Sequence, residues 1–148
     1  LWSYLQPVLF EKNWKRVSFN YDSKDSVPLE RGVYIVTIST SHLSTNNPFK
    51  IFNTPFYIGM STKLRQRFAT HTITTFDRDN LIKRLGFFSR KSIFYYIELP
   101  NYTRQQLLFI EQSLIDVFGG AGNQSNSLSI KNKEIILATF KEGEEHGA

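Results

Sequence analysis

The sequence predicts an α+β domain in which a small three-stranded antiparallel sheet is flanked by helices. Two short runs rich in β-branched and aromatic residues, 32–39 (GVYIVTIS) and 55–60 (PFYIGM), are followed by two helix-like segments and a third such run, 92–99 (SIFYYIEL). Runs of this length and composition are typical of strands. The segment 102–119 carries apolar residues at intervals of three and four, which is typical of an amphipathic helix. The expected order from residue 32 onward is therefore ββααβα.

The segments outside this core follow a weaker pattern. Residues 1–16 are expected to form an N-terminal amphipathic helix, interrupted by Pro7. Its apolar positions include Trp2, Leu5, Leu9 and Trp14. Residues 17–30 are polar and are expected to be irregular, and residues 40–54 form a polar connection between the first two strands.

The helices of the core have recognisable limits. One helix is expected over residues 62–72 and a second over 77–85. The helix over 102–119 begins with Thr103 and Gln106 at the spacing of a capping box and ends at a pair of glycines.

Length and composition favour one domain over residues 1–148. A chain of 148 residues with 41% hydrophobic and 15% aromatic residues can build one substantial core. The expected organisation is an N-terminal extension (1–31), a core (32–126), and a C-terminal extension and tail (127–148).

Composition also excludes several classes of protein. The chain has no cysteine, which excludes a disulfide scaffold and a cysteine-ligated zinc site, and its three histidines are too widely spread to suggest a zinc cluster. No apolar run approaches the roughly 20 residues of a membrane span. We therefore expect a soluble, cytoplasmic protein with no membrane partner.

Two aromatic-glycine signatures mark the first two strands. They are Gly32-Val33-Tyr34 and Tyr57-Ile58-Gly59, and strand alternation can direct both phenols to one face of the sheet. Arg67 and His71 follow, four residues apart and hence on one side of the next helix. Each element alone also has an ordinary explanation, since strand tyrosines usually pack in a core and an Arg/His pair is often a solvated helix edge.

Glu111 interrupts the apolar stripe of the long helix. At 100° per residue it falls between Leu107, Leu114 and Phe118, near the middle of the stripe. A buried carboxylate needs a cation, hydrogen-bond donors or a proton, because an unpaired buried anion is very unfavourable. A metal ion or a core ion pair with an arginine such as Arg67 would satisfy it.

In this order and spacing, these residues resemble the GIY-YIG nuclease superfamily over roughly residues 32–126. The resemblance implies a metal-dependent endonuclease in which Glu111 binds Mg²⁺ or Mn²⁺ and Arg67 clamps a phosphate oxygen. It implies Tyr34 as the general base, with Tyr57 and His71 positioning water or tuning that phenol. It also implies an asparagine in the loop after the helix, for which Asn123 fits best and Asn126 is the alternative.

The sequence departs from the family pattern in two places. The family usually leaves about ten residues between its two signatures, whereas residues 35–56 intervene here. This wide spacing, together with the N-terminal extension, is similar to the restriction-endonuclease branch, in which added segments read the DNA sequence. Val33 replaces the usual isoleucine, which is a conservative β-branched exchange.

Positive charge is concentrated beside the predicted site. The whole chain has a net charge of +5, and residues 63–91 contain eight basic against two acidic residues. A basic cluster suits a polyanion, because phosphate neutralisation releases counterions. The expected partner is DNA, with RNA not excluded, and a solvated face is the ordinary alternative. The residues expected to bind DNA are Lys63, Arg65, Arg78, Lys83, Arg84, Arg90 and Lys91.

Three classes of function remain open on the sequence. The first is an active endonuclease, either a sequence-specific restriction-type enzyme or the nuclease domain of a mobile-element or repair protein. The second is a nucleic-acid-binding module of the same fold that does not cleave. The third is a structural or interaction domain in which Trp2, Trp14 and phenylalanine residues form an oligomer surface, and a homodimer is compatible with any of the three classes.

Overall fold

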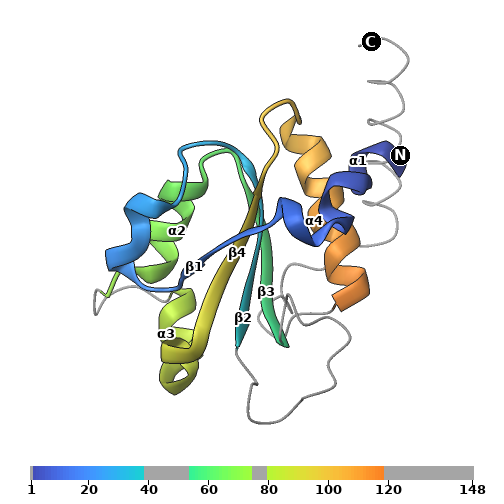
Figure 1. Ribbon diagram of the computed structural model, residues 1–148. Coiled ribbons are helices and arrows are strands. Elements are labelled where there is room, and N and C mark those ends of the chain that lie inside the picture. The colour runs from blue at the N-terminus through green and yellow to red at the C-terminus, as the bar shows by residue number, and fades with distance from the viewer. Residues whose placement is uncertain (1, 39–53, 75–79, 119–148) are drawn as a thin grey trace.

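The computed structural model describes residues 2–38, 54–74 and 80–118 and has an α+β fold (Figure 1). Its four strands form one antiparallel sheet in the order β1-β4-β2-β3. The strands are β1 (Lys15–Ser18), β2 (Gly32–Ile38), β3 (Thr54–Ser61) and β4 (Ser92–Glu98). The α-helices are α1 (Trp2–Leu5), α2 (Leu64–Thr72), α3 (Leu81–Leu85) and α4 (Arg104–Phe118). The 3₁₀ turns are η1 (Gln6–Leu9), η2 (Glu11–Asn13), η3 (Tyr21–Ser26) and η4 (Gly86–Lys91).

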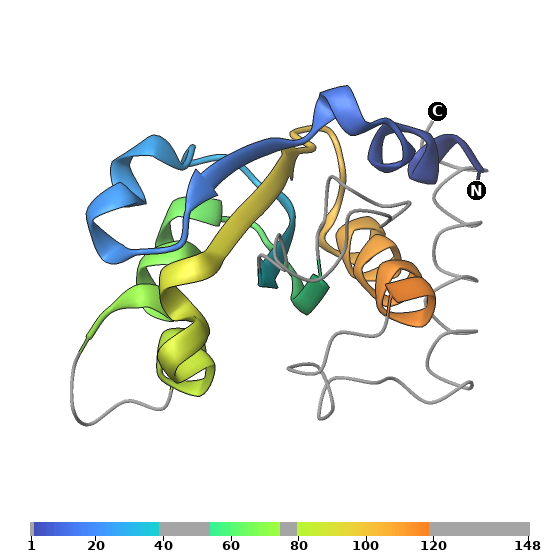
Figure 2. The same ribbon diagram turned by 60° about the horizontal axis from the view of Figure 1, so that its bottom comes forward.

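Helices cover both faces of the sheet. Figures 1 and 2 show α2 and α3 on one side and α4 with the N-terminal α1 on the other. The core under α4 contains Val33 and Ile35 of β2, and the core under α2 contains Tyr34 and Val36 of the same strand. Strand β2 is therefore buried on both faces, which explains its nearly continuous apolar sequence.

The α+β class and the order of the core elements are confirmed, but the three-stranded sheet is wrong. From residue 32 the order is β2-β3-α2-α3-β4-α4, as predicted. The fourth strand, β1, pairs with β4 at the edge of the sheet. Its four residues are exposed apart from the partly buried Val17, so it has no apolar run by which to recognise a strand. Strand β1 is therefore held in the sheet by its hydrogen bonds to β4 and not by a strand-forming sequence of its own.

The single N-terminal helix over residues 1–16 is also wrong. Helix α1 is one turn long and passes into the 3₁₀ turn η1 at Gln6, beside Pro7, which cannot donate a helical hydrogen bond. Trp14 is buried and donates its indole N–H to Val8 O at 3.0 Å. It therefore belongs to the core under α4 and offers no oligomer surface.

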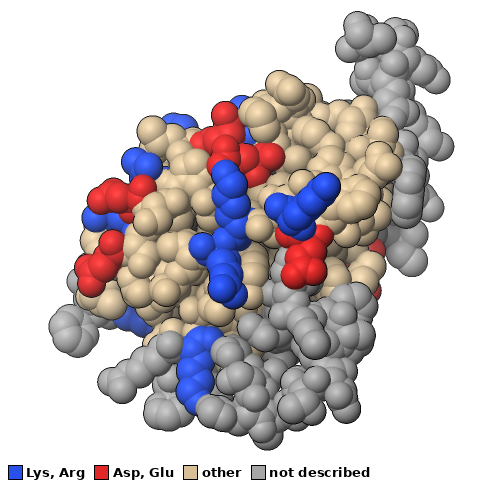
Figure 3. Space-filling view, viewed as in Figure 1, with Lys and Arg blue, Asp and Glu red and all other residues tan. Residues whose placement is uncertain are grey.

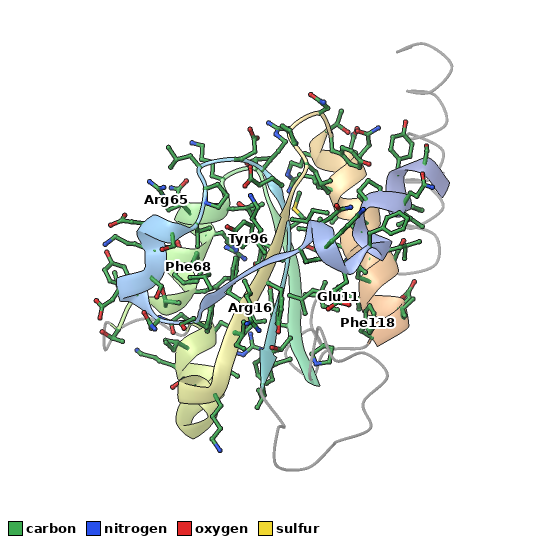
Figure 4. The ribbon with its side chains drawn as sticks, viewed as in Figure 1. Glu11, Arg16, Arg65, Phe68, Tyr96 and Phe118 are labelled. Atoms are coloured by element: carbon green, nitrogen blue, oxygen red, sulfur yellow. The ribbon has the colours of Figure 1, made fainter. Side chains whose placement is uncertain are left out.

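The N-terminal extension holds the first turn of α2. Helix α2 has no side-chain cap, and its first amides donate to the extension instead, Leu64 N to Glu30 O at 2.9 Å and Arg65 N to Pro28 O at 3.1 Å. The Arg65 side chain donates to Val27 O at 2.7 Å. Figure 4 shows Arg65 at the start of α2 and Phe68 between this helix and the sheet. The extension is thus integral to the placement of α2.

The predicted ends of the other helices agree with the structure in part. The capping box of α4 is formed, with Thr103 N donating to Gln106 Oε1 at 2.8 Å and Gln106 N to Thr103 Oγ1 at 3.2 Å. Helix α3 begins at Leu81, four residues after the predicted start, where Asn80 accepts from Lys83 N. Residues 75–79, which hold the predicted start, and most of the connection 40–54 lie outside the described residues.

Candidate functional site

Tyr34 and Tyr57 lie on the same face of the sheet, under α2. Tyr34 pairs with Gly59 across β2 and β3, and Tyr57 stands two residues from Gly59, so the two phenols are diagonal neighbours. Their rings stack with centroids 6.1 Å apart and an interplanar angle of 19°. Tyr34 has no exposed surface, and Tyr57 is 6% exposed. The predicted convergence of the two tyrosines is confirmed.

The glycines of the two signatures are required by close approaches. A Cβ atom on Gly59 would overlap Cζ and the hydroxyl of Tyr34, and one on Gly32 would overlap the Ile97 carbonyl and press on Leu64. The absence of a side chain at Gly59 is what lets the Tyr34 phenol lie across the backbone of β3. Glycine at position 59 is therefore required for the observed position of the Tyr34 side chain.

We predict that Gly59→Ala lowers stability by about 1–3 kcal/mol, the usual cost of overpacking a core. Thermal unfolding followed by circular dichroism measures this loss. In a Tyr34→Leu background, which removes the overlapped ring atoms, the same substitution should cost much less. An equal cost in both backgrounds would show that the strain lies elsewhere.

Helix α2 brings Arg67 and His71 against the two phenols. The Tyr34 hydroxyl and His71 Nε2 are 2.8 Å apart, and the His71 ring centroid is 5.4 Å from that of Tyr57. Arg67 interacts with both phenols by charge and by hydrogen bonds. Because a guanidinium only donates, the Tyr34 oxygen accepts from Arg67, and the hydroxyl can donate to His71 Nε2 in the tautomer that carries the imidazole proton on Nδ1. The result is a hydrogen-bond chain from Arg67 through Tyr34 to His71.

Burial keeps both members of the Tyr34–His71 pair neutral. Desolvation, assisted by the neighbouring Tyr57, raises the pKa of the Tyr34 phenol far above its ordinary value, against the opposing charge of Arg67. Desolvation, together with Arg67 and Arg84, lowers the pKa of His71 to about 3. At neutral pH the imidazole is therefore uncharged and can accept a hydrogen bond from the phenol, while its low pKa opposes protonation.

Glu111 of α4 reaches this group at the outer edge of β3. Its carboxylate accepts hydrogen bonds from the Met60 backbone N–H and from Gln112 Nε2, the latter at 3.0 Å. Its charge acts on Tyr34 and Arg67. Glu111 lies between buried residues of the helix, as the helical wheel predicts, and its own side chain is partly exposed. The four other residues named from the sequence lie on the α2 face of the sheet, and Glu111 acts on two of them through its charge from the α4 face.

Burial is the largest influence on the Glu111 carboxyl group. It raises the pKa to about 7, although the hydrogen bonds from Gln112 and Met60 and the charges of Arg67 and Arg104 oppose it. The hydrogen bonds and neighbouring arginines do not fully offset the cost of burying the carboxylate. A bound cation would offset the rest, so Glu111 is suited to a cation site.

This shift predicts how the metal-free protein responds to pH. The folded pKa of Glu111 lies above the ordinary value of 4.5, so the folded state binds the proton more tightly and loses stability as pH rises from about 4.5 to 7. In EDTA, the free energy of unfolding should fall by about 3 kcal/mol more in the wild type than in Glu111→Gln between pH 4 and 8. Urea titrations at both pH values measure it, and parallel changes in the two proteins would contradict the shift.

The donor set at Glu111 fits Mg²⁺ or Mn²⁺ better than zinc. In the described part of the chain, no three His, Cys, Asp or Glu side chains gather as a possible metal site. Mg²⁺ retains several waters and is commonly held by one or two carboxylates together with substrate phosphates, whereas zinc takes three or four nitrogen or sulfur ligands. A single carboxylate, on which the charge of Arg67 also acts, suits the former better than the latter.

Part of the predicted basic surface borders the site. Arg84 acts electrostatically on His71, so the basic end of α3 adjoins α2. On the face seen in Figure 3, Lys and Arg side chains form a band down the middle with acidic side chains on its flanks, so this face carries both signs of charge. The exposed residues among those predicted to bind DNA are Lys63, Lys83, Arg84 and Lys91.

Other predicted positions have different surroundings or fall outside the described residues. Arg65 is tied to the carbonyls of Val27 and Asp25 by side-chain hydrogen bonds of 2.7 and 3.2 Å, so its guanidinium is structural in the free protein. The side chain of Arg90 is outside the described part, as are three whole residues, Arg78, Asn123 and Asn126.

Sequence reasoning missed the second donor to Glu111. Gln112 is 4% exposed and follows Glu111 directly, and only the folded helix shows that its amide turns toward the carboxylate. The one available signal was a polar residue next to the apolar stripe. The Met60 amide could not have been found either, because a backbone donor has no sequence signature.

No family model, curated protein or solved structure matches the chain. Among residues 2–38, 54–74 and 80–118, no helix has the length and apolar character needed to cross a membrane.

Proposed function

We propose that this protein is a divalent-metal-dependent endonuclease that hydrolyses phosphodiester bonds in DNA. The observation that carries the proposal is that Arg67 hydrogen-bonds to Tyr34 and Tyr57 while the charge of Glu111 acts on both Arg67 and Tyr34. A carboxylate for a hard cation and a guanidinium for a phosphate are the two recognition elements that metal-assisted phosphodiester hydrolysis needs.

The resemblance to GIY-YIG nucleases supports the same conclusion. Its motif positions Tyr34, Tyr57, Arg67, His71 and Glu111 are the interacting residues described above. The core elements also follow the ββααβα order that the resemblance implies. Among alternative classes, a purely structural domain offers no reason to bury a carboxylate beside this group at a cost in stability.

The chain's own residues divide the chemistry between them. Arg67 is exposed and can clamp a non-bridging phosphate oxygen with its guanidinium, countering charge that builds in the transition state. Tyr34 acts as the general base once it has released its phenolic proton to solvent, and His71 Nε2 holds the phenol in place. The phenolate then takes a proton from the attacking water, whose oxygen bonds to phosphorus as the bond to the leaving oxygen breaks. The charge of Arg67 stabilises the phenolate between these transfers.

Glu111 is the residue that would hold Mg²⁺ or Mn²⁺. A cation bound there supplies polarisation of the scissile phosphate and stabilisation of the leaving oxygen. Tyr57, at 6% exposure, is the more accessible phenol and can orient water beside Tyr34.

One observation favours a second candidate, a nucleic-acid-binding module that does not cleave. Tyr34 is fully buried in the free protein, and a general base must reach the water that it activates. The nuclease proposal therefore requires DNA binding to open a path for water to the Tyr34 oxygen.

Incubation of supercoiled plasmid and linear DNA with the protein, in Mg²⁺ and in EDTA, separates the two candidates. The nuclease proposal expects nicked or linear products in Mg²⁺ and none in EDTA. Discrete fragments would indicate a restriction-type reader, and a smear would indicate a non-specific or structure-directed enzyme. Salt-sensitive binding without any Mg²⁺-dependent product would support the binding module instead.

A further inference from the structure

A buried amide stands beside the Glu111 carboxylate. Gln112 is 4% exposed, and its Nε2 donates to Glu111 Oε1 at 3.0 Å. We infer that Gln112 is a positioning residue, which fixes the Glu111 carboxylate in the orientation that receives the divalent cation. This inference rests on the proposed function and extends it to a residue outside the predicted set.

Helix geometry alone does not bring the side chains of Glu111 and Gln112 together. Adjacent residues in a helix point about 100° apart and do not normally face each other, whereas pairs three or four apart do. In α4, Leu107, Ile110 and Leu114 fill the core face, and Gln112 is buried with them although it is polar. A buried amide that curls back to its neighbour's carboxylate has a specific partner.

Two donors from different elements then hold the carboxylate. The Met60 N–H comes from β3, the outermost strand on that side of the sheet, and the Gln112 amide comes from α4. A carboxylate has about four acceptor positions, so these two bonds fix its plane and still leave capacity for a cation. Partners that orient a metal ligand typically change metal affinity or activity by 10–100-fold when they are removed.

The test compares Mn²⁺ binding by the wild type and by Gln112→Met, followed by electron paramagnetic resonance titration. Methionine keeps the length and volume of the side chain but cannot donate. We expect the Mn²⁺ dissociation constant to rise about tenfold or more. Gln112→Asn has an amide on a side chain one methylene shorter, which should not reach Glu111, so its Mn²⁺ dissociation constant should rise by a similar factor. This variant replaces Gln112→Met in the test if the methionine variant does not fold.

A second readout separates positioning from general damage to the helix. In cleavage assays, the Mg²⁺ concentration for half-maximal rate should rise with the Mn²⁺ dissociation constant, and excess Mg²⁺ should restore the rate, while DNA affinity in EDTA stays unchanged. Gln106→Met is the matched control, because it removes a capping bond of the same helix without touching Glu111. It should lower thermal stability and leave Mn²⁺ affinity at the wild-type value.

Two different results would overturn the inference. Wild-type Mn²⁺ affinity in folded Gln112→Met or Gln112→Asn would remove Gln112 from the site and leave the nuclease proposal intact. Equal Mn²⁺ binding by the wild type and Glu111→Gln would show that no cation binds at Glu111. Both the inference about Gln112 and the nuclease proposal would then be wrong.

Discussion

Glu111→Gln should reduce the single-turnover rate constant of DNA cleavage by at least about 10³-fold in saturating Mg²⁺. Glutamine keeps the shape of the side chain but removes the anion that attracts the cation. The Met60 N–H can still donate to the amide oxygen, so the edge of β3 should remain intact. DNA affinity measured in EDTA should be close to that of the wild type.

Glu98→Gln is the matched control for this substitution. Glu98 lies on β4, is exposed, and forms a surface ion pair with Lys15 at 3.5 Å. Loss of an exposed pair costs little, so this variant should cleave at the wild-type rate. Near-normal cleavage by Glu111→Gln would remove Glu111 as the cation ligand.

Arg67→Ala should lower the single-turnover rate constant by about 10²–10³-fold, the usual loss when one transition-state donor is removed. The substitution removes the proposed phosphate clamp and also the positive charge that favours the ionised form of Tyr34. Arg67→Lys should recover only part of the rate, because an ammonium keeps the charge but lacks the planar fork that binds two oxygens. Rapid-quench measurements at saturating enzyme isolate the chemical step.

Arg65→Ala distinguishes this effect from a general loss of positive charge. Arg65 stands two residues before Arg67, and its guanidinium donates to the carbonyls of Val27 and Asp25. We expect its loss to reduce thermal stability with a much smaller change in rate. If Arg67→Ala instead weakens only DNA affinity, by a factor that disappears at high salt, Arg67 is a binding residue and not part of the chemistry.

The local parts of the site could be predicted because each depends on short-range geometry. Tyr34 and Tyr57 share a face because strands alternate, and Arg67 and His71 share a face because helices repeat every 3.6 residues. The capping box at Thr103 is likewise a contact across three residues. These rules operate within one element or one pair of neighbouring strands, so the sequence contains them.

The N-terminal extension could not be predicted because long-range contacts determine it. Lys15 and Arg16 carry no strand pattern, and they become β1 only because β4, almost 80 residues later, offers an edge to pair with. The carbonyls of Pro28 and Glu30 accept from the first amides of α2, which has no side-chain cap. Tertiary pairing overrides weak local preference in both places.

The surroundings of Glu111 were predicted only in part. The helical wheel correctly placed the acid among buried residues of α4, but it could not show that the side chain stays partly exposed where β3 ends the sheet. The carboxylate emerges at that edge, where a backbone amide and Gln112 meet it. The order of strands in a sheet is a global property that a helical wheel does not contain.

Crystals of the protein with a short DNA duplex and Mn²⁺ would test the proposed cation site most directly. Anomalous scattering should locate a Mn²⁺ ion with a Glu111 oxygen among its ligands, at about 2.0–2.2 Å, and with a phosphate that Arg67 also contacts. A Mn²⁺ ion held elsewhere, with the bound phosphate remote from Glu111, would contradict a hydrolytic site at the edge of β3.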